Sequence, residues 1–386
     1  MLLAPSLLLG ATVDLPRTGQ TTCYTETGVL IACAGTGQDG EIQAGIAWPD
    51  PRFSDNGDGT ITDHLTGLVW LKNTDCFGRI KWSEALAAAN GLADGTCGLT
   101  DSSAAGDWRL PNVLELASPA HMGVADSIAW LESFGFTGMD TIVRWSSTTD
   151  TAGFTAVFGY QFRDRWTSAL VKTGTYKVWP VRGAATGPAK LWKTGQTTCY
   201  DDLSNDSVAC PGTGQDGEIQ AGVAWPDPRF NDNGDGTVTD NLTGLIWLED
   251  TNCFGSRFWS DALSDASSLA DGDCSLTDNS TASDWRLPNT WEVLSLNDFS
   301  RSYPALPPTH PFTNISGWPH WTSTSQRSVG VYGYQGKPGG KGGYSFALKT
   351  EASNVWPVRG ELGAVPPIFE DGFESGDTSA WSGEVP

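Results

Sequence analysis

The chain has 386 residues, of which 39% are hydrophobic and 18 are Trp, and its formal net charge is −22. Such a composition can build the cores of two or three domains, which excludes a mostly disordered chain. A negative field repels phosphate backbones and anionic lipid headgroups, so nucleic-acid binding is not expected. The 46 Gly and 22 Pro favour short strands and turns over long helices.

The N-terminus resembles part of a secretory signal. Residues 2–13 are small and apolar, but no basic residues precede them. The run is too short to span a bilayer, and no other apolar run in the sequence is long enough. We therefore interpret residues 1–17 either as a truncated leader or as a weak secretory signal. We expect a secreted or cell-surface protein, extracellular or periplasmic, without a membrane-spanning segment.

The sequence contains an internal duplication at a constant offset of 176–177 residues, which indicates two homologous domains. The repeated motifs are TGQTTCY at 18–24 and 194–200, GTGQDGEIQAG at 35–45 and 212–222, DWRLPN at 107–112 and 284–289, and VWPVRG at 178–183 and 355–360. The predicted parts are domain 1 at 18–183, a linker at 184–193, domain 2 at 194–360, and an acidic, Gly-rich tail at 361–386.

Eight cysteines are divided equally between the repeats. No CxxC motif occurs, and no His stands at matching places to complete a zinc site. An even count in a secreted chain predicts disulfides, each contributing roughly 3 kcal/mol. The sequence does not prove the connectivity, but the simplest pairing is local. It gives Cys23–Cys33, Cys76–Cys97, Cys199–Cys210 and Cys253–Cys274.

Each repeat shows the same predicted elements in chain order. The stretch TITDHLTGLVWL from residue 60 predicts strand, turn and strand. WSEALAAANGL then predicts a helix capped by Ser83, with Trp82, Ala85, Leu86 and Ala89 as its apolar stripe. A second helix should follow WRLPN, where Asn112 and Glu115 have capping-box spacing, as do Asn289 and Glu292. This predicts α+β domains, each with a small twisted antiparallel sheet, two helices and many loops.

The loops SDNGDGT and NDNGDGT allow two interpretations. An EF-hand is excluded, because Leu65 and Leu242 stand where its twelfth-position acid is needed. A looser calcium site remains an alternative, and its candidate ligands are Asp55, Asn56, Asp58 and Asp63, then Asp232, Asn233, Asp235 and Asp240. We expect instead a Gly/Asn/Asp turn whose side chains bond their own backbone.

The motifs GTGQDGEIQAG, AWPDPRF, DNGDGT, DWRLPN and VWPVRG, in fixed order, resemble one family. It is the C-terminal domain family of Legionella collagen-like adhesins, and the resemblance covers both copies and most of residues 18–360. The resemblance implies two tandem C-type-lectin-like domains related to the formylglycine-generating-enzyme fold. It also implies surface exposure, adhesion and polysaccharide binding. A preference for sulfated glycans is not expected here, because the net charge is −22.

The repeats differ most between WSSTT or WTSTS and VWPVRG. This divergence is either drift in exposed loops or a binding face. The candidate ligand-binding residues are Arg144, Trp145, Tyr160, Gln161, Arg163, Asp164 and Trp166 in the first domain, then His320, Trp321, Tyr332, Tyr334, Gln335, Lys337 and Tyr344 in the second. Exposed aromatic rings can stack on sugars. Trp145 and Trp321 occur in both copies, and we expect those two in the core.

Other classes of function compete with glycan binding. The related enzymes need reactive cysteines or a histidine cluster, whereas the four His of this chain do not recur at matching places. Asp107 and Arg109 in DWRLPN, with Asp284 and Arg286, are expected in ion pairs or caps. We therefore expect a non-enzymatic protein that binds a glycan or a surface protein. A structural surface protein, or one with diversified ligand loops, remains the alternative.

Overall fold

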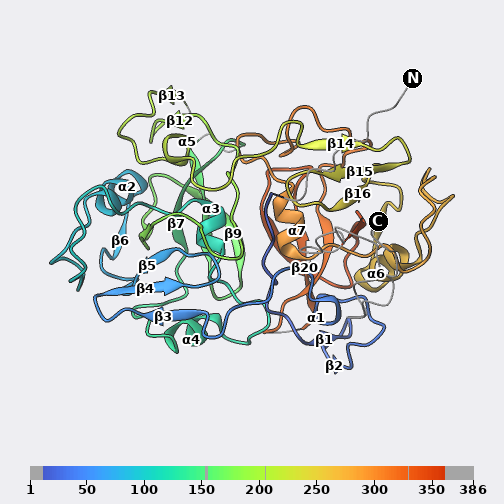
Figure 1. The fold of residues 1–386 in the computed structure, drawn as a ribbon, viewed down its shortest axis with the longest axis horizontal. Coiled ribbons are helices and arrows are strands. Elements are labelled where there is room, and N and C mark those ends of the chain that lie inside the picture. Colours follow the sequence, from blue (N-terminus) through green and yellow to red (C-terminus); the bar gives the residue numbers. More distant parts are fainter. Residues whose placement is uncertain (1–11, 153–154, 205, 329, 361–386) are drawn as a thin grey trace, which may run out of the picture.

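The computed structural model describes residues 12–152, 155–204, 206–328 and 330–360. Part of the predicted leader (1–11) and the whole tail (361–386) lie outside the described residues. Among the residues described, no helix is long and apolar enough to cross a membrane. The two repeats form two similar sheet-rich units, which we call the first unit (residues 53–182) and the second unit (residues 230–359) (Figure 1).

The first unit contains a four-stranded and a five-stranded sheet, with orders β11-β5-β4-β3 and β6-β10-β7-β8-β9. The strands are β3 (Phe53–Asp55), β4 (Thr60–Asp63), β5 (Val69–Leu71), β6 (Arg79–Ile80), β7 (Arg144–Asp150), β8 (Ala156–Gln161), β9 (Trp166–Val171), β10 (Tyr176–Lys177) and β11 (Val181–Arg182). The helices are α2 (Trp82–Asn90), α3 (Val113–Ala117) and α4 (Ser127–Glu132).

The second unit repeats this arrangement, with sheet orders β14-β15-β16-β22 and β17-β21-β18-β19-β20. The strands are β14 (Phe230–Asp232), β15 (Thr237–Asp240), β16 (Ile246–Leu248), β17 (Ser256–Arg257), β18 (His320–Ser325), β19 (Tyr332–Gly336), β20 (Tyr344–Leu348), β21 (Ser353–Asn354) and β22 (Val358–Arg359). The helices are α6 (Trp259–Ser268) and α7 (Thr290–Ser295).

The predicted hairpins are present, and the two predicted helices of each repeat are present as α2 and α3 and as α6 and α7. Each unit has a four-stranded and a five-stranded sheet instead of the one predicted sheet. Three further differences are found. Both five-stranded sheets contain one parallel pair, β10 with β7 and β21 with β18, so they are not purely antiparallel. Among the described residues of the second unit, helix α4 has no counterpart. Helix α2 begins at Trp82, so Ser83 lies inside the helix instead of capping it; the backbone N–H of Lys81 donates to Glu84.

The segments that precede the two units are exchanged between them. The N-terminal segment (residues 12–46) holds β1 (Cys23–Tyr24), β2 (Leu30–Ile31) and α1 (Asp39–Ile42). The middle segment (residues 189–222) holds β12 (Cys199–Tyr200), β13 (Ser207–Val208) and α5 (Asp216–Ile219). Figure 1 shows the dark-blue N-terminal segment beside the orange second unit, and the yellow-green middle segment beside the first unit.

Backbone hydrogen bonds, as well as side-chain hydrogen bonds, connect each segment to the opposite unit. The N–H groups of Thr12 and Val13 donate to the carbonyl of Leu242 in the second unit, each at 3.0 Å. The N–H of Ala189 donates to the carbonyl of Leu65, the equivalent residue of the first unit, also at 3.0 Å. Part of the predicted linker 184–193 is therefore packed structure, with the Trp192 side chain fully buried.

The two units share one hydrophobic core. It runs from Phe53 and Trp179 of the first unit to Trp247 and Trp356 of the second. At the centre, where β9 and β20 are in contact, the hydroxyls of Tyr160 and Tyr344 are 2.8 Å apart. All four predicted disulfides are present with the local connectivity. They lie in the segments and beside the shared core instead of crossing between the units.

Candidate functional site

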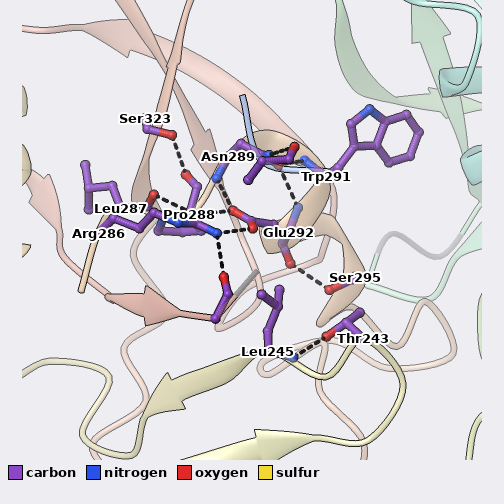
Figure 2. Close-up of polar contacts among 12 residues, drawn as sticks. Thr243, Leu245, Arg286, Leu287, Pro288, Asn289, Trp291, Glu292, Ser295 and Ser323 are labelled. Carbon is purple, nitrogen blue, oxygen red and sulfur yellow. Dashed lines mark hydrogen bonds and ion pairs between the residues drawn. The ribbon is translucent and has the colours of Figure 1, made fainter. Parts of the chain in front are cut away.

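The WRLPN motif starts the second helix of each unit through a buried ion pair. Arg286 donates from both terminal nitrogens to the Glu292 carboxylate, at 2.7 and 2.6 Å (Figure 2). Glu292 also accepts from the backbone N–H of Asn289, whose side chain accepts from the N–H of Glu292. The first unit repeats this with Arg109, Glu115 and Asn112, so the capping boxes are confirmed.

The aspartates of the same motif cap turns, as expected. Asp107 accepts from the backbone N–H of Ala104 at 2.8 Å, and Asp284 accepts from that of Thr281 at 2.6 Å. The arginines are ion-paired with glutamates of the following helix instead of with these aspartates. This network belongs to the scaffold, because both charged partners are engaged with each other.

Each exchanged segment places one buried carboxyl on the opposite unit. Asp39 in α1 accepts from the hydroxyls of Thr18 and Thr324, at 2.6 and 2.7 Å. Its equivalent, Asp216 in α5, accepts from Thr194 and Thr148, both at 2.7 Å. Within the described residues, the second oxygen of each carboxyl has no hydrogen-bond partner. Burial raises the pKa of both groups to about 6, although the charges of Arg286 and Arg109 act in the opposite direction on Asp39 and Asp216.

A buried lysine also bonds each exchanged segment to the opposite unit. The Lys349 ammonium lies 3.9 Å from the Trp259 ring centre and donates to the carbonyls of Tyr24 and Thr25. Its equivalent, Lys172, donates to the Asp201 carbonyl at 2.7 Å. Desolvation lowers the pKa of Lys349 to about 7 and that of Lys172 to about 8.

Two equivalent clefts lie where the segments meet the helices of the opposite units. The N-terminal cleft, of about 590 Å³, lies between the N-terminal segment and α6, and includes Ile31, Ile42 and Leu263. The middle cleft, of about 540 Å³, lies between the middle segment and α2. Its lining residues Val208, Ile219 and Leu86 are the equivalents of the first three. Both clefts are formed by residues of both repeats.

The DNGDGT loops form the expected side-chain-to-backbone turn. Asp58 accepts from the backbone N–H and hydroxyl of Thr60, at 3.0 and 2.6 Å. Gly59 has a φ of 87°, and a Cβ there would lie 2.4 Å from the Gly98 carbonyl oxygen, so only glycine fits. Asp235 and Thr237 repeat the same bonds in the second unit.

The candidate calcium ligands do not converge into one site. Asp63 is buried in an ion pair with Arg52, and Asp240 in one with Arg229. Asp55 accepts from the N–H of Gly57 and pairs with Lys72. In the part of the chain that the structure describes, no three acidic, His or Cys side chains gather as a metal centre would need. A calcium role for the exposed members, which include Asn56, Asp232 and Asn233, stays a prediction.

The structure separates the candidate ligand-binding residues by burial. The buried ones are Arg144, Trp145, Tyr160, His320, Trp321, Tyr334, Gln335 and Tyr344. Trp145 and Trp321 are in the core as expected, and their ring N–H groups bond the carbonyls of Ile80 and Arg257. The half-buried ones are Gln161, Asp164, Trp166, Tyr332 and Lys337, and Arg163 is exposed. Only this second group offers surface to a ligand in the present conformation.

Arg163 and Asp164 line a third cleft of about 470 Å³, which we call the hairpin cleft. It also contains Asp126 at the start of α4, Thr141, and Ser328 from the second repeat. Gln161 fixes the turn between β8 and β9, because its side chain accepts from the N–H of Asp164 at 2.6 Å and donates to the Thr141 carbonyl. Trp166 faces Gln161 across the hairpin register.

Sequence reasoning missed the residues that join the two repeats. Gln20 bonds both backbone groups of Ser325, and Gln196 does the same with Thr149. The signal was present, because TGQ and GQDGE occur in both copies. It did not reveal that these motifs bind the opposite repeat.

These features define a tandem, disulfide-bonded, sheet-rich repeat protein in which each unit is completed by an exchanged segment. The chain belongs to the Lcl C-terminal domain family, whose model matches residues 59–182 and 236–359. Both exchanged segments lie outside the matched residues. No curated protein matches the chain, and neither does any solved structure.

Proposed function

We propose that this protein is a secreted or cell-surface, non-enzymatic binding protein that recognises glycans through the hairpin cleft. The observation that carries the proposal is the lining of this cleft by one guanidinium, two carboxylates and two hydroxyls, from Arg163, Asp126, Asp164, Thr141 and Ser328. These groups can donate to and accept from sugar hydroxyls.

Further observations support this proposal. Trp166, on the same hairpin, is half-buried, and aromatic side chains that are partly exposed can stack on a sugar. All eight cysteines are in disulfides, so no described thiol serves as a nucleophile. Disulfides also favour an oxidising location outside the cytosol. A C-type-lectin-type fold is part of the proposal, because membership of the Lcl C-terminal domain family supports it only at the level of resemblance.

The test is a glycan-array screen of the oxidised full-length protein, in calcium and again in EDTA. Arg163→Ala should weaken binding at least about tenfold, because it removes a charged hydrogen-bond donor from the cleft. Arg301→Ala is the matched control, since Arg301 is also exposed but lies outside the hairpin cleft. Unchanged binding by Arg163→Ala would contradict the assignment of the site. Binding lost in EDTA would indicate that glycan binding needs a metal ion, and would support the DNGDGT loops as the calcium site.

A protein-binding function is the second candidate. It is favoured by the exposed apolar side chains of the β1–β2 hairpin, where Val29 and Leu30 are 59% and 62% exposed. A full-length protein that binds no glycan in either condition would support this second candidate over the first.

A further inference from the structure

The N-terminal cleft is surrounded by more exposed apolar surface than the middle cleft. Val29 and Leu30 precede its lining residue Ile31, whereas Asp206 and Ser207 precede the equivalent Val208. Phe258, at the start of α6, is 50% exposed, and Lys81 stands at its equivalent place. The duplication therefore provides two clefts with equivalent lining residues. The N-terminal cleft has the more extensive apolar rim, because Leu203 is the main exposed apolar side chain beside the middle cleft.

The chain leaves the second unit at the rim of this same cleft. The carbonyl of Gly360, the last described residue, accepts from Arg286 at 3.4 Å, and Arg286 lines the N-terminal cleft. The sequence continues as ELGAVPPIF, with one charge followed by eight uncharged residues. Nine residues can extend about 30 Å, so the run AVPPIF (364–369) is within reach of the cleft.

The place that this tail would take by analogy with the first repeat is already filled. After Gly183, the equivalent of Gly360, the chain packs back on the first unit, and Ala189 bonds the Leu65 carbonyl. On the second unit the equivalent carbonyl, that of Leu242, accepts instead from Thr12 and Val13 of the N-terminal segment. The tail therefore cannot bind the second unit as residues 189–193 bind the first.

We propose that residues 364–369 of the tail bind in the N-terminal cleft, with Ile368 and Phe369 packed against Ile42 and Leu263. The apolar rim supplies the attraction, and two consecutive prolines hold the tail extended, so little conformational entropy is lost on binding. The acidic residues that follow Phe369 stay in solvent, because Glu26 and Glu41 at the cleft repel them. This contact is independent of any glycan in the hairpin cleft.

The test is hydrogen–deuterium exchange of the full-length protein. Ile42→Asp should accelerate exchange of the Ile368 and Phe369 amides at least about tenfold, because a carboxylate in the apolar cleft expels the tail. Ile219→Asp is the matched control: Ile219 is 41% exposed, Ile42 is 42% exposed, and the two are equivalent. This control should leave both amides unchanged.

The reciprocal variant tests the cleft from the tail side. Phe369→Asp should accelerate exchange of the amides in residues 30–36, and leave those of residues 207–213 unchanged. Equal exchange of the Ile368 and Phe369 amides in wild type, Ile42→Asp and Ile219→Asp would overturn the proposal. Protection that rises with protein concentration would also overturn it, because the occupant would then be the tail of a second copy.

Discussion

The two junctions, at which the N-terminal segment meets the second unit and the middle segment meets the first, use equivalent residues but differ in chain connection. The middle segment directly follows the unit that it completes, whereas the N-terminal segment completes a unit whose sequence begins almost two hundred residues later. Lys172 donates one bond of 2.7 Å, while Lys349 makes two longer ones of 3.4 and 3.3 Å. Equivalent contacts thus join neighbouring parts of the sequence at the middle segment, and distant parts of the sequence at the N-terminal segment.

The largest effect is expected where the two repeats are most alike. Glu292→Ala removes the buried carboxylate that accepts two hydrogen bonds from Arg286, and should lower the free energy of unfolding by about 3–5 kcal/mol. Glu115→Ala should cost a similar amount, measured by urea denaturation. Glu292→Gln keeps an acceptor for Asn289 and should cost less. A loss below about 1 kcal/mol for either alanine variant would contradict the structural equivalence of the two networks.

An intermediate effect is expected from pH, because Asp39 and Asp216 have pKa values of about 6 against an ordinary 3.8. The folded protein holds protons that the unfolded chain releases. Their stabilisation is therefore complete below about pH 3.8 and is lost as the pH rises through 6. Between pH 4 and 7 the free energy of unfolding should fall by about 1–3 kcal/mol per carboxyl.

The control for this pH effect is the variant Asp39→Asn/Asp216→Asn. The amide oxygen can accept both threonine hydroxyls, and the amide nitrogen takes the place of the oxygen without a partner. Its stability should change less with pH than that of the wild type, measured by thermal unfolding at each pH. An identical pH profile for the two proteins would show that these carboxyls do not titrate in this range.

The smallest effect is expected where the repeats differ in charge. Lys72 pairs with Asp55 beside the first DNGDGT loop, whereas Glu249 takes its place beside Asp232. Partial burial and the negative charges of Asp232 and Asp250 raise the pKa of Glu249. Glu249→Lys should stabilise the protein by a few tenths of a kcal/mol, less at high salt. Lys72→Glu should destabilise it by a similar amount, and a thermal melt of both variants would reveal an effect of opposite sign.

Local features were predictable from the sequence, and the exchange was not. Disulfides, hairpins and the Asn112 and Asn289 caps depend on neighbours within about twenty residues, so each repeat encodes them alone. In contrast to these local features, the partner of Asp39 could be either Thr148 or Thr324. Because the duplication makes the two threonines locally equivalent, no local pattern decides between them.

The burial of the divergent candidates has a related cause. Tyr160 and Tyr344 lie where the two units face each other, and their hydroxyls bond across that contact. Side chains at such a contact must complement each other, and they need not be identical. Divergence between the repeats, which the sequence alone attributes to drift or ligand binding, therefore also arises at the contact between the two units. The sequence alone does not distinguish these three causes.

The exchanged N-terminal segment has a consequence for the order in which the protein is made. Residues 53–222 contain the first unit and its segment, so they can close while translation continues. Residues 12–46 leave the ribosome before either unit, yet their acceptor is complete only when residue 359 has emerged. A circular permutant that begins at residue 47 and carries residues 12–46 after Gly360 would remove this delay, because each unit would then be followed directly by its own segment.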